Sequence, residues 1–569
     1  MQIYKNWLKS KEILLILIFL LGAFVRFVCL GDYPVGFHSQ EALLGYRARS
    51  LLTIGKDELS RSWPLIFTSF IDYQLPLPTY LVMLSVKIFG PSEFSVHFFF
   101  AFFGVISILA LFGVVRNLFP QRKNLAYWVA FLMAVVPWSV FLSRIAFPEG
   151  LGLFLFLIGF YFLSKQKGRF SKINFLGAVI FLIASLYTTK TAWLFIPVFL
   201  IGLLFIGNEL GLRRKLWPLI IIVLILFSPL LIGYLKLPSV KRSFLENNFS
   251  LFTDISVTNA VNSMRGNELK FGNPLLGKLF FNKGYWLVKY GEKFLAHFSP
   301  AYYFAIGDQN SLHGLWNFGP VYFVLLLPCL WGMWWILKNK EQGGKLLLFW
   351  FSLVAVASSF IKKSPDTAIL IFALPVILVL IGLGMEELVK RRLLLIFLPL
   401  FVFNILLVTY DALQKEPIRA QSGWFYGFKE VPMLLKKYNY QDFDKVYLTD
   451  GYAPDPAPLL LFFSQYSSVK LQKKETSIKY HFWINQIENI HIGRVEEFSL
   501  LPGERGLFVV TPQEEKNWLS KLVFLDEDKE PSEKRCYKIY DEIVGLDNKP
   551  VLLIASSLAD NCVLVKPEK

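Results

Sequence analysis

The sequence predicts an all-α polytopic membrane helix bundle of about eleven transmembrane helices, followed by a C-terminal extracytoplasmic α/β domain. Three observations support this fold class. Of the 569 residues, 54% are hydrophobic and only 18% are charged, and the hydrophobic residues lie in many separate runs. Lysine and arginine concentrate in alternate connections between these runs. After residue 410, short β-type runs replace the long apolar ones.

Each long apolar run is a candidate span, because a bilayer core about 30 Å thick needs about 20 residues per helix. The run 76–90 is short and interrupted by Pro76 and Pro78, so we interpret it as a helix at the membrane interface. The first run lacks the cleavage pattern of a signal peptide and is interpreted as a retained helix. The predicted spans are 13–30, 93–115, 125–141, 149–164, 174–187, 191–207, 215–235, 319–337, 345–361, 367–384 and 392–410.

Basic residues predict the orientation of these spans. With a cytoplasmic N-terminus, every inner segment carries at least three lysines or arginines, whereas the short outer connections carry one or two. This places loops 31–92 and 236–318, and the segment after 410, outside the cytoplasm of a multi-pass plasma-membrane protein. Much of the net charge of +17 is then spread over inner loops, which argues against nucleic-acid binding.

The segment 411–569 predicts a small α/β domain, distinct from the transmembrane domain 1–410. Its β-type runs are 445–449, 506–511 and 551–555, and it contains neither a glycine-rich phosphate loop nor a nucleophile elbow. Cys536 and Cys562 both fall here, where the sequence allows either a disulfide or two unpaired thiols.

Loop 31–92 carries the strongest functional signal. A carboxylate beside hydrocarbon is costly, so Glu41 at the mouth of a helix bundle indicates chemistry or ligand binding. The alternative is that Glu41 caps a helix or pairs with Arg47 or Arg49. Asp72 is a second candidate, for which the alternative interpretation is an ordinary turn residue.

The first loop carries four motifs in order: Gln40-Glu41-Ala42 with Gly45-Tyr46, Ile54-Gly55-Lys56-Asp57-Glu58, Ile71-Asp72-Tyr73-Gln74-Leu75-Pro76-Leu77, and Phe89-Gly90-Pro91-Ser92-Glu93-Phe94. Through these motifs, residues from 36 to about 118 resemble the start of the bacterial GT-C glycosyltransferases, which are related to protein O-mannosyltransferases and lipid A aminoarabinose transferases. Weaker matches continue through Val136-Pro137-Trp138, Ser143 to Phe147, Tyr187 to Ala192, and the segment from His297 to His313.

This resemblance implies transfer of a sugar from a polyprenyl-phosphate donor to a protein, lipid or glycan acceptor. Such a reaction needs a carboxylate that orients or deprotonates the acceptor, and positive charge or a metal that stabilises the departing phosphate. We therefore expect Glu41 and Asp72 to be catalytic. The expected substrate-binding residues are Gln40, Tyr73, Gln74, Arg144, Lys190, Asp308 and His313. A divalent metal is a further expectation, with Glu41, Asp72, His297 and His313 as ligands if the two external loops meet.

The sequence departs from the family pattern at two important positions. Gln40 stands where the family has an Asp and Gln74 where it has a Lys, and a carboxamide is neither a base at neutral pH nor a source of charge. One hypothesis is an active transferase in which Glu41 or Asp72 acts as base and Lys190 or Arg144 receives the phosphate. The other is a catalytically degenerate homologue that binds lipid-linked glycan without transfer.

Several of these residues also have structural interpretations. Arg144 and Lys190 stand at the outer ends of predicted helices, where long basic side chains often serve as interfacial anchors. For His313, the alternative to a metal or phosphate role is an ordinary surface histidine. A transporter is the third function class, but the sequence shows neither an inverted repeat nor paired broken spans.

Overall fold

The computed structural model describes most of the chain. The described residues are 2–68, 73–166, 170–206, 213–237, 255–281, 285–308, 310–315, 317–339, 342–361, 363–473, 478–479, 483–501, 503–525, 531–558 and 562–564. They form two compact units, one made of Met1–Val28 with Phe100–Asp411 and the other of Cys29–Phe99 with Ala412–Lys569. We call the first the helical unit and the second the loop–sheet unit, and describe each by itself.

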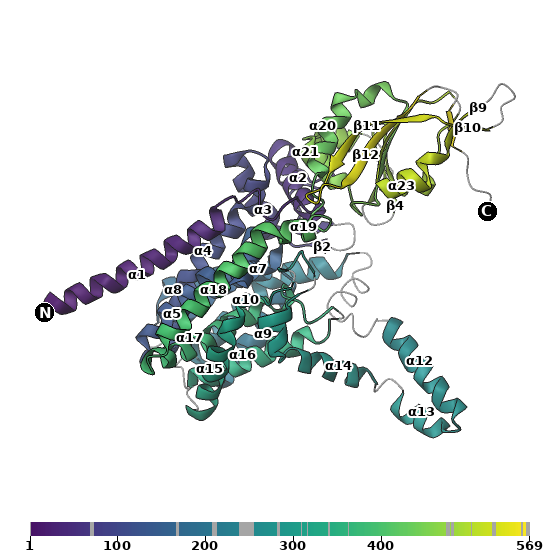
Figure 1. The fold of residues 1–569 in the computed structure, drawn as a ribbon. Coiled ribbons are helices and arrows are strands. Elements are labelled where there is room, and N and C mark those ends of the chain that lie inside the picture. The colour runs from purple at the N-terminus through teal and green to yellow at the C-terminus, as the bar shows by residue number, and fades with distance from the viewer. Residues whose placement is uncertain are drawn as a thin grey trace. The chain divides into compact units, whose positions relative to one another are not determined.

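The helical unit is a bundle in which α15, α16 and α17 pack against one another and α17 also packs against α5 (Figure 1). The helix α4 enters this unit from the loop–sheet unit, and α18 leaves it. Its elements are α1 (Gln2–Phe27), α4 (Glu93–Leu118), α5 (Lys123–Val135), α6 (Pro137–Arg144), α7 (Pro148–Ser164), α8 (Lys172–Leu186), α9 (Thr191–Ile206), α10 (Arg213–Leu235), α12 (Ile255–Lys270), α13 (Pro274–Phe280), α14 (Tyr285–Ala296), η1 (Tyr302–Ile306), η2 (Phe323–Leu325), α15 (Leu326–Asn339), α16 (Gln342–Ser358), η3 (Ile369–Ala373), α17 (Leu374–Lys390) and α18 (Leu394–Gln414).

Every predicted span falls on helix in this unit or at its edge, and the interfacial run 76–90 is the helix α3 (Pro76–Phe89). Among the described residues, four helices are long and apolar enough to cross a membrane, and the bent pair α5 and α6 forms a fifth candidate. The four are Glu93–Leu118, Lys215–Leu235, Ile369–Lys390 and Leu394–Gln414. Several other apolar helices are shorter than this test requires, so the count of eleven crossings stays a prediction.

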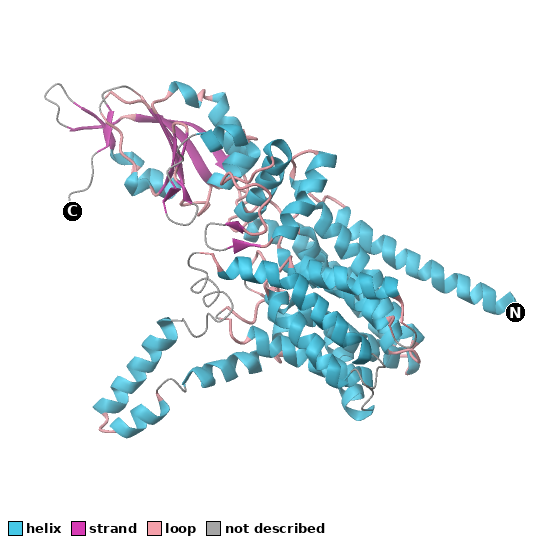
Figure 2. Cartoon of the chain, turned by 180° about the vertical axis from the view of Figure 1, so that it is seen from behind, coloured by secondary structure: helices cyan, strands magenta, loops and turns pink. Residues whose placement is uncertain are grey.

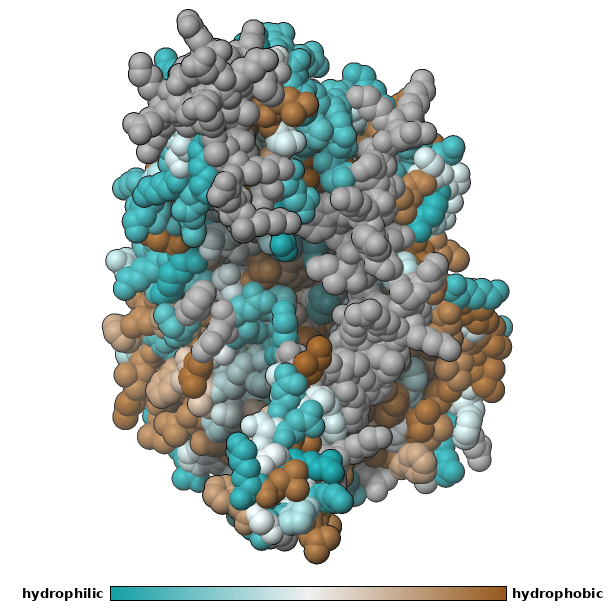
Figure 3. Space-filling model, turned by 90° about the vertical axis from the view of Figure 1, so that its right-hand side faces the viewer, coloured by the Kyte–Doolittle hydropathy of each residue, from teal (hydrophilic) through white to brown (hydrophobic). Residues whose placement is uncertain are grey.

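Burial separates the central helices from the peripheral ones. In Ile369–Lys390, 89% of an 18-residue apolar stretch is buried, whereas in Leu394–Gln414 only 22% of such a stretch is buried. Large apolar side chains therefore remain on the outside of the bundle, and Figure 3 shows hydrophobic side chains gathered over its flanks. A water-soluble protein rarely leaves so much contiguous apolar surface exposed, and a bilayer covers it. The chain is thus an integral membrane protein.

A buried arginine closes the break between α5 and α6. Pro137 has no N–H and cannot continue α5, so carbonyl groups in the last turn of α5 lose their helical partners. The guanidinium of Arg26 donates to the carbonyl oxygen of Met133 at 2.8 Å and to that of Ala134 at 3.0 Å. It also donates to Ser139 Oγ at 2.7 Å. The α5–α6 bend of 50° thereby keeps its backbone hydrogen-bonded inside an apolar bundle.

The loop–sheet unit contains the first loop and a mixed six-stranded sheet with order β11-β12-β8-β3-β7-β6 (Figure 2). The central strand β3 runs parallel to both β7 and β8, and β12 runs antiparallel to β8. The helices and single-turn elements are α2 (Ser39–Ile54), α3 (Pro76–Phe89), α19 (Glu416–Ala420), η4 (Phe428–Glu430), α20 (Val431–Lys437), η5 (Tyr440–Asp442), α21 (Ala457–Phe463), α22 (Ser468–Lys473), η6 (Val495–Glu497), α23 (Pro512–Asn517) and η7 (Leu519–Lys521). The strands are β1 (Phe67–Thr68), β2 (Tyr73–Gln74), β3 (Lys445–Thr449), β4 (Ile478–Lys479), β5 (Trp483–Ile484), β6 (Gln486–Ile487), β7 (Ile490–Gly493), β8 (Gly506–Val510), β9 (Leu522–Leu525), β10 (Pro531–Arg535), β11 (Tyr537–Val544), β12 (Pro550–Ser557) and β13 (Cys562–Leu564).

The three β-type runs predicted from the sequence are β3, β8 and β12, so the small C-terminal α/β domain is confirmed. Aromatic side chains fill one face of its sheet, where Tyr447 stacks on Phe508 and on Phe498. Cys536 lies in this core and is disulfide-bonded. The side chain of Cys562, the other cysteine of the predicted pair, lies outside the described ones.

The composition of the loop–sheet unit bears on membrane topology. Helix α21 of the C-terminal segment packs against α2 of the first loop. Two segments that pack in one compact unit lie on the same side of a membrane, so the intervening chain crosses it an even number of times. The ten spans predicted between residues 93 and 410 satisfy this requirement.

Candidate functional site

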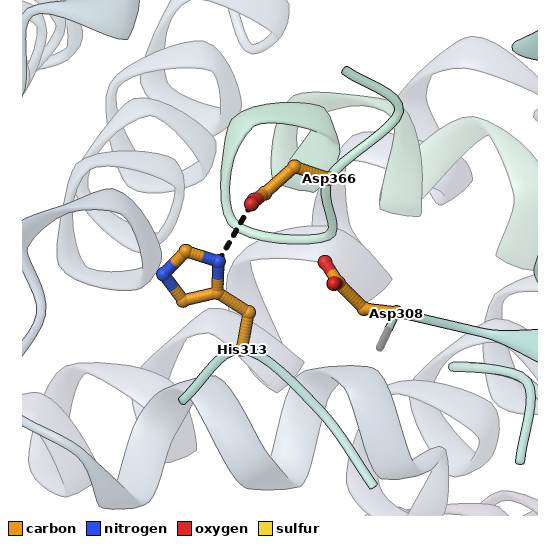
Figure 4. A group of neighbouring side chains, drawn as sticks. All are labelled: Asp308, His313 and Asp366. Atoms are coloured by element: carbon orange, nitrogen blue, oxygen red, sulfur yellow. Dashed lines mark hydrogen bonds and ion pairs between the residues drawn. The ribbon is translucent and has the colours of Figure 1, made fainter. Parts of the chain in front are cut away.

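Asp308 and His313 of one loop and Asp366 of another converge in the helical unit (Figure 4). One ligand atom from each lies within 4.8 Å of the other two. His313 Nδ1 and Asp366 Oδ2 are 2.7 Å apart, and the carboxyl group of Asp308 faces them. Asp366 is buried, whereas 22% of the His313 side chain is exposed. The three side chains therefore form a polar group that remains accessible from solvent, and we call it the triad.

A tight turn presents two members of the triad. Gly307 has a φ of +69°, and a Cβ there would lie 1.9 Å from the carbonyl oxygen of Phe318, so only glycine fits. Asp308 Oδ1 then accepts the N–H of Asn310 at 2.9 Å, which is an Asx turn. The N–H of His313 donates to the carbonyl oxygen of Asn310 at 2.9 Å. Local hydrogen bonds thus fix Asp308 and His313 relative to each other.

The third member comes from the connection that leads into η3. Asp366 Oδ1 accepts the N–H of Ala368 at 2.9 Å and so caps the first turn. Thr367 joins the two loops, because its N–H donates to Asp308 Oδ2 at 2.9 Å and its hydroxyl donates to the His313 carbonyl oxygen at 2.6 Å. The side chains are therefore held by backbone groups on both sides.

Burial and mutual charge set the protonation of the triad. Burial raises the pKa of Asp308 above its ordinary value, and the nearby charge of Asp366 raises it further. Burial alone lowers the pKa of His313, but the hydrogen bond and charge of Asp366, together with Asp308 and Glu149, raise it overall. The protonated imidazole is therefore favoured beside these carboxylates.

Glu149 and Lys190 extend this charged region. Glu149 begins α7, next to the Pro148 that starts the helix, and lies within electrostatic range of His313, Asp366 and Lys190. The ammonium of Lys190 lies 5.2 Å from the centroid of the Tyr234 ring, an arrangement that favours a cation. The helical unit thus brings carboxylates, an imidazole and an ammonium into one region.

Tyr302 adds a buried hydroxyl to the same region. Its Oη has no hydrogen-bond partner among the residues that the structure describes, and its side chain is 9% exposed. Burial raises its pKa, and the charges of Asp308 and Asp366 raise it further, so the phenol stays protonated. It is a buried hydrogen-bond donor within electrostatic range of two carboxylates.

Glu41, the carboxylate singled out from the sequence, is fully buried in the loop–sheet unit. It occupies the third position of α2 and its Oε2 accepts the N–H of His38, while the His38 side chain accepts from the helix start, which is a capping box. Its Oε1 lies 3.0 Å from Nε2 of His97. Glu41 thus takes the capping position that the sequence left open as an alternative.

The other first-loop candidates surround a buried ion pair. Arg47 and Glu58 are both buried and form a salt bridge. Arg47 Nη1 also donates to Gln74 Oε1 at 2.7 Å. Tyr73 is buried beside Gln74 in β2, and Gln40 is exposed at the start of α2. Asp72 lies outside the described residues.

Arg144 and His297 have structural partners. The guanidinium of Arg144 donates to the carbonyl oxygens of Val25 at 2.8 Å and Arg26 at 3.1 Å, which ties α6 to the end of α1. His297 is fully buried, with Nδ1 2.6 Å from the Lys293 carbonyl oxygen and Nε2 2.6 Å from Ser364 Oγ.

Asp366 and Glu149 are the members of this region that sequence reasoning missed. Asp366 follows Ser364 and Pro365, so the sequence suggests an ordinary turn residue. Its side chain caps the turn before η3, and an Asp in that position is the one local signal that could have marked it. Glu149 is the first residue of the predicted span 149–164. A charged residue at the end of an apolar run is the signal that could have marked it.

Comparison with known proteins supports the family resemblance. The sequence profile described as dolichyl-phosphate-mannose-protein mannosyltransferase matches residues 74–232. No curated protein sequence matches the chain. Among solved structures, the apo form of ArnT from Cupriavidus metallidurans has a TM-score of 0.53 at 12% identity, covering 98% of this chain and 100% of that one. The same protein bound to undecaprenyl phosphate has a TM-score of 0.50 at 11% identity, covering 97% and 99%.

A similarity with a lower TM-score is to an archaeal oligosaccharyltransferase. AglB from Archaeoglobus fulgidus, in complex with an inhibitory peptide and a dolichol-phosphate, has a TM-score of 0.46 at 15% identity, covering 84% of this chain. The chain spans 62% of the length of that protein. The resemblance to GT-C glycosyltransferases that the sequence predicts is confirmed, and the ArnT comparison extends the shared fold through the C-terminal domain.

Proposed function

We propose that this protein transfers a sugar from a polyprenyl-phosphate donor to an extracytoplasmic protein, lipid or glycan acceptor. The observation that carries the proposal is the fold shared with ArnT over 98% of the chain. ArnT has been solved with undecaprenyl phosphate, a lipid carrier of the proposed chemical class. The match of residues 74–232 to a mannosyltransferase profile points to the same chemistry.

The charged region of the helical unit suits such a reaction. Lys190 offers a positive charge for the departing lipid phosphate. It is a better candidate than Arg144, because Nη1 of Arg144 already donates to two backbone carbonyl oxygens. Glu149 is a candidate for the carboxylate that orients or deprotonates the acceptor. Asp72 is the first-loop carboxylate that we retain for the same role, and the capped, buried position of Glu41 supports a positioning role.

The orientation of the protein is part of this proposal. We place the N-terminus in the cytoplasm and the loop–sheet unit outside the plasma membrane, because every predicted inner segment is rich in lysine and arginine. Fusing a reporter that is active only outside the cytoplasm to the C-terminus tests this. An active reporter is expected, and activity of the complementary cytoplasmic reporter would reverse the assignment.

Donor turnover and lipid binding test the function separately. Purified full-length protein is incubated with polyprenyl-phosphate sugars and membrane vesicles of its native host, and release of polyprenyl phosphate is measured. Binding of polyprenyl phosphate is measured in parallel by native mass spectrometry. Turnover supports the transferase. Binding without turnover of any hexose or pentose donor supports the degenerate homologue, and absence of binding refutes both.

The role of Lys190 has a matched control within the chain. Lys165 also lies over a tyrosine ring, that of Tyr161 at 4.4 Å, but it follows the C-terminal end of α7, opposite the end that carries Glu149. Lys190→Met is expected to lower turnover at least about tenfold, because a charge that stabilises the leaving phosphate is lost. Lys165→Met should leave turnover unchanged. Equal turnover in both variants would remove Lys190 from the mechanism.

A further inference from the structure

We propose that Asp308, His313 and Asp366 bind a divalent transition-metal ion, with Zn²⁺ as the best fit. The three ligand atoms lie within 4.8 Å of one another, so one ion can contact all of them after small side-chain shifts. Imidazole selects zinc and its neighbours over Mg²⁺, and carboxylates complete the ligand set of many zinc sites. Three protein ligands leave at least one coordination position for water.

The ligand atoms are oriented in advance. Backbone N–H groups hold both oxygens of Asp308 and one oxygen of Asp366, at 2.9 Å in each of the three contacts. Figure 4 shows Nδ1 of His313 turned toward the carboxylates. Each carboxylate oxygen keeps lone-pair capacity after accepting one such bond. Supporting hydrogen bonds of this kind are typical around metal ligands, because they fix ligand geometry before the ion arrives.

The unsatisfied hydroxyl of Tyr302 is an independent observation that points to a ligand here. Its Oη has no hydrogen-bond partner among the described residues, although the side chain is nine-tenths buried. The phenol lies within electrostatic range of both Asp308 and Asp366, the two carboxylate ligands of the proposed ion. A metal-bound water would accept the hydrogen bond that Tyr302 can donate, because buried polar groups are rarely left unpaired.

The charge balance of the region also favours a cation. Three carboxylates, those of Asp308, Asp366 and Glu149, lie within electrostatic range of His313. Lys190 is the cation that acts on Glu149 besides His313. Buried carboxylates that share one site repel each other, and a divalent ion relieves this repulsion. On binding, the ion takes the place of the proton between His313 Nδ1 and Asp366 Oδ2, and that proton leaves to solvent.

His297 and His491 do not share this environment and so provide controls. Both ring nitrogens of His297 contact oxygen atoms of the protein backbone or a serine. His491 lies in β7 of the C-terminal sheet, with its ring 5.7 Å from that of Tyr447. Neither belongs to the metal-ligand group found among the described residues.

Metal binding by the full-length protein in detergent tests the proposal without any assay of transfer. The protein is stripped with chelator and dialysed, and Zn²⁺ or Mg²⁺ is titrated by calorimetry while bound metal is counted by mass spectrometry. We expect one Zn²⁺ per chain, no saturable Mg²⁺ binding, and a higher unfolding midpoint with Zn²⁺. His313→Gln and Asp308→Asn should weaken Zn²⁺ binding at least about tenfold, whereas His491→Gln should bind as the wild type.

Visible absorption of Co²⁺ gives a second measurement. Co²⁺ in a site with nitrogen and oxygen ligands is expected to show absorption bands in the wild type and in His491→Gln that are lost in His313→Gln. His313→Gln keeps a side chain that can still hydrogen-bond to Asp366, so its folding can be checked by an unchanged unfolding midpoint in chelator. Wild-type protein without stoichiometric Zn²⁺, or His313→Gln with undiminished Zn²⁺, would overturn the metal site. Neither result bears on donor turnover, so the two proposals fail independently.

Discussion

Substituting Glu41 distinguishes a capping residue from a catalytic base. In Glu41→Gln, the carboxamide oxygen can still accept the N–H of His38, and the side chain can still hydrogen-bond to His97, so the buried contacts survive. We expect this variant to keep its unfolding midpoint within a few degrees and its donor turnover within about threefold. A true general base would lose about two to four orders of magnitude in turnover, because a carboxamide cannot take up the proton.

Glu41→Ala supplies the magnitude of the structural role. Removing the Glu41 half of the capping box leaves the His38 N–H without its acceptor and costs about 0.5–2 kcal/mol. Leaving the buried His97 without its acceptor costs about 1–3 kcal/mol more. We therefore expect a loss of about 3 kcal/mol in the free energy of unfolding, read from thermal or denaturant unfolding in detergent. The double variant Glu41→Ala/His97→Leu removes both members of this pair, so neither is left buried without a partner. A well-folded Glu41→Gln protein with turnover reduced a hundredfold would refute this reasoning and restore Glu41 as the base.

Three further predictions concern stability. Burial lowers the pKa of His297 to about 4, and the charge of Lys293 contributes, so the unfolded state binds the proton first as pH falls. Stability should decline from about pH 6.5 to about pH 4 by roughly 3 kcal/mol, and His297→Gln should flatten this part of the unfolding profile. Arg47→Met should cost about 3–5 kcal/mol by leaving Glu58 buried and unpaired, and adding Glu58→Leu should recover most of it in equilibrium unfolding. Gly307→Ala should cost more than about 1 kcal/mol and lower the unfolding midpoint, because a positive φ and a backbone clash both oppose a Cβ.

Much of the fold could be predicted because its signals are local. Long apolar runs dictate helices wherever a bilayer is the solvent, and each predicted span lies on a helix of the structure. The runs 445–449, 506–511 and 551–555 became strands because β-branched and aromatic residues there are buried on both faces of a sheet. The number of membrane crossings is harder to predict, because several helices are shorter than a bilayer core and only their packing could decide.

The candidate site was harder to predict because it depends on tertiary packing. His313 and Asp366 are 53 residues apart, and nothing in either segment indicates that they meet. Glu41 was hard to interpret for a different reason. Its capping box lies within four consecutive residues, but the sequence of this box is unusual. The N-cap residue is His38, which is not among the residues that usually occupy that position, so the Glu three residues later did not read as its partner.

The packing around Gln74 explains how one departure from the family pattern is accommodated. Its Oε1 accepts a hydrogen bond from Arg47, whose charge is already paired with Glu58 in a buried setting. A lysine at this position would place a second cation against Arg47, with a single carboxylate between them. Glutamine instead satisfies a donor and adds no charge. The position therefore belongs to the internal structure of the first loop in this chain, and Lys190 in the helical unit is the cation we assign to the phosphate.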